Sequence, residues 1–172
     1  SDKYKINPVN CTHFHKIEFR AKLRMKEFFL KWYEFNAWAN RKVIDCIKRQ
    51  SVSDEKILMV MSHLVSANFI WLNRIKDLPK SQYELWQKYD VASLVKMIDE
   101  ADTLWMAFLN ENENFDRVLK YRNYVGDYFE TNVQQILIHL VNHGSYHRGQ
   151  VAMLLRERGF EPVNTDYITY DR

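Results

Sequence analysis

The 172-residue chain is long enough for one domain with a single substantial core. Apolar residues make up 47% of it, with only four glycines and three prolines, a composition that favours a few long helices. The net charge of +3 comes from residues 1–24, which hold six Lys/Arg and two Asp/Glu and leave 19 basic and 20 acidic residues for the rest. The remainder is close to neutral, which argues against a nucleic-acid-binding surface.

The two cysteines, Cys11 and Cys46, form no CxxC pair, so neither a disulfide framework nor a cysteine metal site is expected. Because no long apolar run and no signal peptide are visible, we expect a cytoplasmic protein without membrane contact. Residues 1–24 are polar and lack a sustained period. We interpret them as an N-terminal extension, either native and packed on the domain or foreign to it, with Met25 near the native start of a domain covering residues 25–172.

Two helices are expected in the first half of the domain. Residues 26–48 carry aromatic and aliphatic side chains at intervals of three and four, the spacing of one buried helical face. Ser51 and Ser53 are candidate N-caps for a second helix that runs to about residue 76, with Pro79 beyond its end. Residues 79–90 then form a connection with three aromatic side chains.

Two further helices are expected in the second half. Asp90 is a candidate cap for a helix over residues 91–109. Residues 110–130 lose the helical pattern and predict a short hairpin or an ordered loop. The last helix, residues 132–158, follows a capping-box spacing between Thr131 and Gln134 and ends at Gly159. The sequence therefore predicts an all-α fold, a four-helix bundle with an aromatic core.

Three histidines follow one another at intervals of four in the last expected helix: His139, His143 and His147. Side chains at that interval lie on the same face, and two imidazoles one turn apart can reach one ion. On a helical wheel, His143 and His147 fall within the apolar stripe, whereas His139 lies at its flank. We predict that His143 and His147 are metal ligands and that His139 supports them or lines a pocket. The alternative is a pair of hydrogen-bonded core histidines.

A third ligand is expected from a facing helix, and His63 is the only histidine in another expected helix. It lies beside the main apolar stripe of its helix, so a boundary residue without a ligand role stays an alternative. Three imidazoles suit zinc, nickel, copper or iron and leave coordination positions for water or substrate. Arg148 and Gln150, which follow His147, are candidates to orient a ligand ring or to position the helix end.

Four segments resemble the DinB branch of the DinB/YfiT-like superfamily. They are YEFNAWANR at 33–41, SHLVSANFIWLNRI at 62–75, HLVNHGSYHRGQ at 139–150 and PVNTDYI at 162–168. The resemblance implies a four-helix bundle, frequently a homodimer, with a divalent ion, commonly nickel or zinc, held by three histidines. Carried over to this sequence, those ligands are His63, His143 and His147.

Two functions are consistent with this pattern. The first is a metal-dependent enzyme, a transferase or hydrolase, acting with a small thiol as some relatives do. The second is a non-catalytic stress-response or interaction bundle in which the metal is structural. That alternative predicts a fourth protein ligand, such as His139 or a carboxylate, and no cleft beside the ion. Binding to nucleic acid is not expected.

Overall fold

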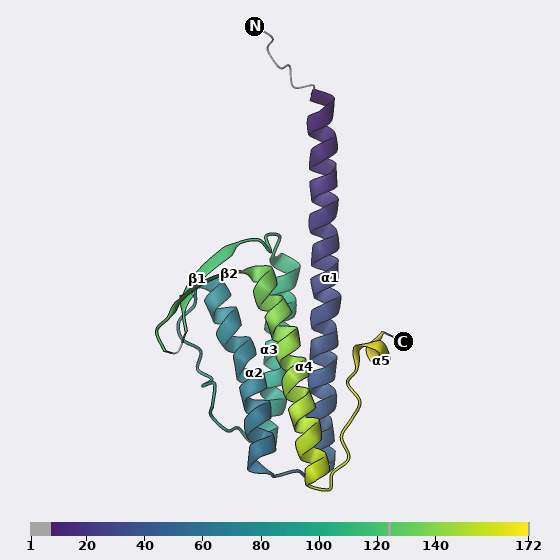
Figure 1. The fold of residues 1–172 in the computed structure, drawn as a ribbon, viewed down its shortest axis with the longest axis vertical. Helices are drawn as coiled ribbons and strands as arrows, with labels where there is room; N and C mark the ends of the chain where they lie inside the picture. The colour runs from purple at the N-terminus through teal and green to yellow at the C-terminus, as the bar shows by residue number, and fades with distance from the viewer. Residues whose placement is uncertain (1–7, 124, 172) are drawn as a thin grey trace.

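Four long helices and a β-hairpin make up most of the chain in the computed structural model (Figure 1). The structure describes residues 8–123 and 125–171, with side chains from residue 18 on except Phe19. In chain order the elements are α1 (Pro8–Arg49), α2 (Glu55–Lys76), α3 (Val91–Glu111), β1 (Val118–Arg122), β2 (Tyr128–Asn132), α4 (Val133–Glu157) and the short α5 (Tyr167–Tyr170). The predicted all-α four-helix bundle is confirmed.

Each long helix packs on two others. α1 and α2 both contact α3 and α4, so α1 and α2 lie diagonally across the bundle. This arrangement places α2 beside α4, the two helices that carry the predicted metal ligands. No helix in the described part of the chain is long and apolar enough to cross a membrane.

α1 begins far earlier than the predicted residue 26. It starts at Pro8, and its N-terminal part extends beyond the end of the bundle (Figure 1). Residues 20–24 are exposed, so this part of α1 has no buried face and no apolar period in its sequence. A helix start placed by that period therefore falls too late in the chain. Proline is tolerated in a first helical turn. His13 and His15 lie in this N-terminal part, and neither is expected to be a metal ligand; their side chains lie outside the described residues.

Helix starts show where the cap predictions hold and where they fail. Asp90 caps α3, accepting a hydrogen bond from the Ser93 backbone N–H at 2.7 Å as predicted. α2 is capped by Asp54 rather than by a serine, since the Asp54 carboxylate accepts from two backbone N–H groups of the first turn. The capping box of α4 is formed by Asn132 and Gln135, one residue later than predicted.

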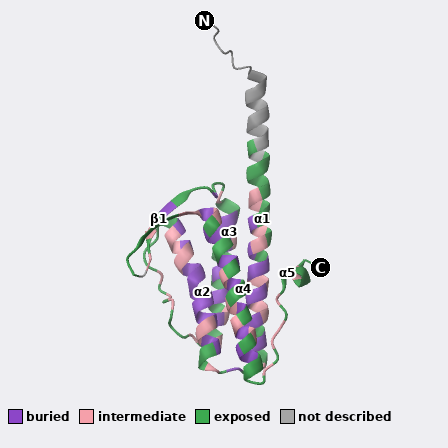
Figure 2. Ribbon diagram, viewed as in Figure 1, coloured by how far each residue is buried: buried purple, intermediate pink, exposed green. Residues whose placement is uncertain are grey.

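The core is rich in aromatic side chains, and Figure 2 shows the buried residues on the inward faces of the four helices. Trp105 is fully buried, stacks on Tyr33 at a centroid distance of 5.5 Å and donates to the Asn68 carbonyl at 3.1 Å. The predicted buried face of residues 26–48 is partly wrong. Its spacing includes Phe28, which is 55% exposed, and omits Tyr33, which is buried. A sequence period gives the direction of a face only to within about one residue.

The segment between α3 and α4 is a two-stranded antiparallel hairpin, one of the two predicted alternatives. Tyr121 of β1 pairs with Phe129 of β2. Tyr121 also packs edge-on against Trp71 of α2, with ring centroids 5.2 Å apart. The hairpin is therefore held against the same helix that carries His63.

Candidate metal centre

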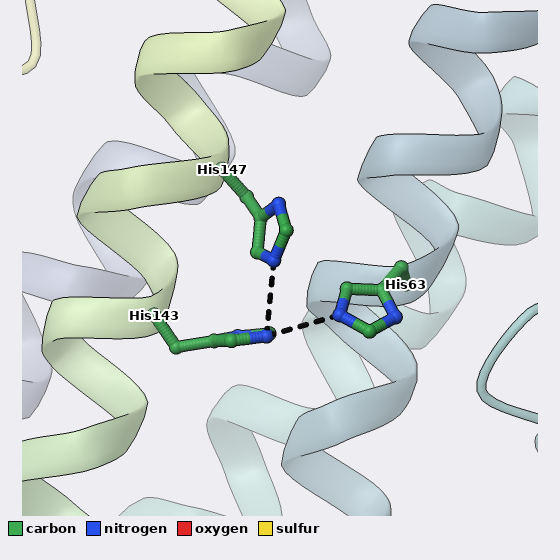
Figure 3. A group of neighbouring side chains, drawn as sticks. All are labelled: His63, His143 and His147. Carbon is green, nitrogen blue, oxygen red and sulfur yellow. Dashed lines mark hydrogen bonds between the residues drawn. The ribbon is translucent and has the colours of Figure 1, made fainter.

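Two neighbouring helices bring three histidines together (Figure 3). α4 presents His143 and His147 one turn apart, and α2 presents His63 from the opposite side. The Nε2 atom of His143 lies 3.0 Å from Nε2 of His63 and 3.1 Å from Nε2 of His147. Two nitrogens bound to one zinc ion lie at most about 4.2 Å apart, because each bond is about 2.1 Å long. Both separations meet that limit.

Contacts on the outer side determine which ring nitrogens carry protons. The Nδ1 atom of His63 lies 3.3 Å from the Leu85 carbonyl oxygen, and that of His147 lies 2.7 Å from Oε1 of Gln150. A carbonyl oxygen can only accept a hydrogen bond, so both Nδ1 atoms carry a proton and donate it. The Nε2 lone pairs of His63 and His147 therefore point towards His143. Of the two residues proposed for this role, Gln150 makes the contact, whereas Arg148 bonds to Asn36, Asn40 and Ser145 instead of a histidine ring.

The cluster cannot satisfy its own hydrogen bonds. If His143 carries its proton on Nε2, that single proton faces two lone pairs, and if it carries it on Nδ1, three lone pairs meet without a donor. A divalent cation accepts electron density from all three nitrogens at once. The donor set therefore fits a metal such as zinc, nickel or copper, for which imidazole is a preferred ligand.

Burial keeps the three rings neutral at neutral pH. It lowers the pKa of His63 to about 4, with a further contribution from His147. It lowers the pKa of His143 to about 3, aided by the three neighbouring histidines. The pKa of His147 is also lowered by burial, and the contact with Gln150 opposes that shift. Because a metal competes with protons for imidazole, low pKa values favour binding.

The connection between α2 and α3 contributes two groups that the sequence did not indicate. Leu85 supplies the carbonyl that orients His63, and Trp86 stacks on the His63 ring at a centroid distance of 3.9 Å. His63 is 7% exposed as a result, whereas Trp86 is 64% exposed. The only available signal was the aromatic content of this connection, which does not reveal which helix it covers.

His139 lies apart from the three ligand candidates, as the helical wheel predicted. Its ring packs against His143 at 5.2 Å and against Trp71 at 5.5 Å, and it does not belong to the group of converging nitrogens. Tyr146 precedes His147 in the chain and is 64% exposed. Its ring packs edge-on against the His147 ring, with centroids 5.2 Å apart.

A cavity of about 230 Å³ adjoins the histidines. It is lined by His63, His139 and His143 and by Tyr121 and Asn123 of the hairpin region. Its remaining walls come from α2 and from the connection that follows it: Ala67, Ile70, Trp71, Arg74 and Leu85. The guanidinium of Arg74 packs on both the Trp71 and the Tyr121 ring there, at 4.7 and 4.8 Å from their centroids. The site therefore has room for a small molecule beside the ligand candidates.

The fold and the site define a class of protein: a four-helix bundle with a buried three-histidine cluster between two of its helices, able to hold a metal ion. The sequence model of the DinB family matches residues 25–172, so the chain belongs to the DinB family. It is 29% identical over 164 residues to Protein DinB of Bacillus subtilis (strain 168), covering 85% of this chain and 95% of that protein.

A solved structure shows the same fold. The crystal structure of a DinB-like protein from Bacillus cereus ATCC 10987 superposes with a TM-score of 0.65 at 19% sequence identity. The superposition covers 80% of this chain and 95% of that chain. At this level of identity the likeness concerns the fold alone.

Proposed function

We propose that the chain is a metal-dependent enzyme of the transferase type, with a nickel or zinc ion bound by His63, His143 and His147 and a small thiol as substrate. The observation that carries the proposal is the convergence of three neutral Nε2 atoms beside a cavity. A bound divalent ion supplies positive charge that lowers the pKa of a coordinated thiol or water.

The protein's own residues define what such a substrate would meet. Ile70, Trp71 and Leu85 give the cavity apolar walls on which a small molecule can pack. Leu85 and Gln150 hold the His63 and His147 rings by their outer nitrogens, so the inner nitrogens keep their direction when a ligand enters.

The non-catalytic alternative is less consistent with this geometry. It predicts a fourth protein ligand and no cleft. Within the described residues the converging group holds three histidines and no carboxylate, and a cavity adjoins it. A role in the stress response, a cytoplasmic location and a homodimer stay predictions.

Metal analysis and a spectroscopic titration test the proposal. We expect about one nickel or zinc ion per chain in the purified protein, and loss of the ion in His143→Ala. His139→Ala is the matched control on the same helix and should keep it. Titration of the cobalt-loaded protein with cysteine should produce a sulfur-to-cobalt absorption band if a thiol reaches the ion. Full metal content in His143→Ala would refute the site, and absence of the band would refute the thiol.

A further inference from the structure

A buried arginine lies on the flank of α4 that faces α1. Arg148 is 2% exposed. Its Nη1 donates to Oδ1 of Asn36 and of Asn40, both on α1 and both at 2.7 Å, and its Nη2 donates to Oγ of Ser145 at 3.0 Å. These bonds connect α1 to α4, and they are made entirely to neutral oxygens.

The charge of Arg148 has no counter-ion in the described part of the chain. None of the ion pairs there involves it, and its buried Nε–H has no acceptor. Burial lowers the pKa of Arg148 to about 10, which leaves it charged at neutral pH. Buried charges are normally paired, because transferring an unpaired charged group out of water costs free energy. The Phe35 ring of α1 lies 5.5 Å from the guanidinium carbon and favours a cation there, but it carries no charge that would compensate Arg148. A neutral donor could make the hydrogen bonds to Asn36 and Asn40, so those bonds do not explain the charge.

A cavity of about 590 Å³ adjoins this arginine, between α1, α4 and the segment that leads to α5. Its volume is in the range of small-molecule sites. Three charged residues line it, Arg148, Arg156 and Asp166, so the wall carries one excess positive charge. That excess suits a singly charged anion better than a doubly charged phosphate. Trp32 and Phe35 provide aromatic walls for an apolar body.

Ser145 connects the buried charge to the cavity. Its hydroxyl accepts from Nη2 of Arg148, so its own O–H remains to donate, and Ser145 is itself an exposed lining residue. We propose that this cavity binds a small carboxylate with an aromatic body, whose carboxylate accepts from the Ser145 hydroxyl in front of the Arg148 guanidinium. The site is separate from the histidine cluster and does not depend on a metal.

Paired carboxylates and amides test the proposal on the unmodified protein. Benzoate, phenylacetate and indole-3-acetate would each be titrated calorimetrically beside benzamide, phenylacetamide and indole-3-acetamide, which have the same shape without the charge. We expect at least one acid to bind about tenfold more tightly than its amide, because the charge supplies the discrimination. If no acid binds more tightly than its amide, the proposal is wrong.

Variants locate the binding. Gly149 lines the cavity, and a Cβ built on it meets nothing within 4 Å, so Gly149→Phe puts a ring at the wall without a clash at Cβ. We expect it to weaken binding of the preferred acid about tenfold or more. Met153→Phe adds the same ring at an exposed position of α4 outside the cavity and should bind as the parent does.

Ser145→Ala removes the proposed hydroxyl donor at an exposed position and should reduce the preference for the acid, because the hydrogen bond to a carboxylate is stronger than the one to an amide carbonyl. Circular dichroism and metal content would be recorded for every variant, so loss of the fold or of the histidine site is seen separately. Undiminished acid binding in both Gly149→Phe and Ser145→Ala would place the ligand elsewhere and overturn the proposal.

Discussion

His63 and His143 share an environment in which the neutral ring is strongly favoured. Both rings face other imidazoles and apolar walls, and their pKa values of about 4 and about 3 lie well below the ordinary value of 6.5. A protonated His143 would also repel His63 and His147. These residues therefore act as lone-pair donors over the whole physiological pH range.

The low pKa values predict a loss of stability in acid for the metal-free protein. In the unfolded chain both histidines titrate near 6.5, so below that pH the unfolded state binds more protons than the folded state. We expect the free energy of unfolding to fall as the pH drops from about 6.5 towards about 4. Urea unfolding at several pH values, with a chelator present, measures it. His143→Gln should reduce the slope, and an unchanged slope would show that His143 does not contribute.

At the scale of helix pairs, the contact of α4 with α1 depends on a small residue. A Cβ added to Gly144 would overlap Oδ1 of Asn36 and lie 2.7 Å from Nη1 of Arg148. Both atoms belong to the same buried hydrogen-bond group, so neither moves without breaking a bond. The close approach of the two helices therefore requires glycine at this position.

We expect Gly144→Ala to lower the free energy of unfolding by about 1–3 kcal/mol, the usual cost of overpacking. Gly149→Ala is the matched control in the same helix, where a Cβ meets nothing within 4 Å. It should raise stability by up to about 1 kcal/mol, because alanine favours the helix. Denaturant unfolding of the two variants measures both effects, and equal destabilisation would show that the contact with Asn36 is not the cause.

The positions of the helices along the chain could be predicted better than the rotation of each helix about its own axis. Apolar periods and the Asp90 cap identified α2, α3 and α4 because each records a local rule. The pairing of His143 with His147 was predictable for the same reason, since both lie on one helix. The position of His63 was not, because the rotation of α2 relative to α4 depends on the packing of all four helices. Its identification came from family resemblance.

The contacts around the cluster could not be predicted. Leu85 and Trp86 lie in a connection without regular structure, and no periodic rule places such a segment over a particular side chain. The Arg148 bonds to Asn36 and Asn40 join residues more than 100 positions apart. No local pattern indicates these bonds, because a polar residue within a helix does not show which distant residue it will contact.

For the molecule as a whole, a bound ion would connect α2 to α4 across 80 residues of sequence. Since the unfolded chain does not hold three histidines in place, nickel or zinc should stabilise the folded state. At a free ion concentration of about 100 times Kd, the gain is about 2.7 kcal/mol. Thermal unfolding with and without the ion measures it. The gain should persist in His139→Ala and disappear in His143→Ala, and an equal gain in both would place the ion elsewhere.

The family match begins at residue 25, whereas α1 begins at Pro8. Residues 20–24 are exposed, so we expect a chain starting at Met25 to keep the bundle, with its free energy of unfolding changed by about 0.5 kcal/mol or less. Denaturant unfolding of the two chains measures this. A larger loss would show that the N-terminal part of α1 packs on the domain. Sedimentation of both chains would test the predicted homodimer and show whether the extension is needed for it.

The stacking of Trp86 on His63 has an optical consequence. An indole 3.9 Å from a ligand ring lies within range of electronic quenching by an ion bound to that ring. Nickel, with unpaired d electrons, should quench Trp86 emission strongly, whereas zinc, with a filled d shell, should change it little. Trp86→Phe should reduce the difference, and what is left should come mainly from Trp71, which lines the cavity beside the histidines. The intensity of tryptophan emission beside the site would then report which of the two ions the protein holds.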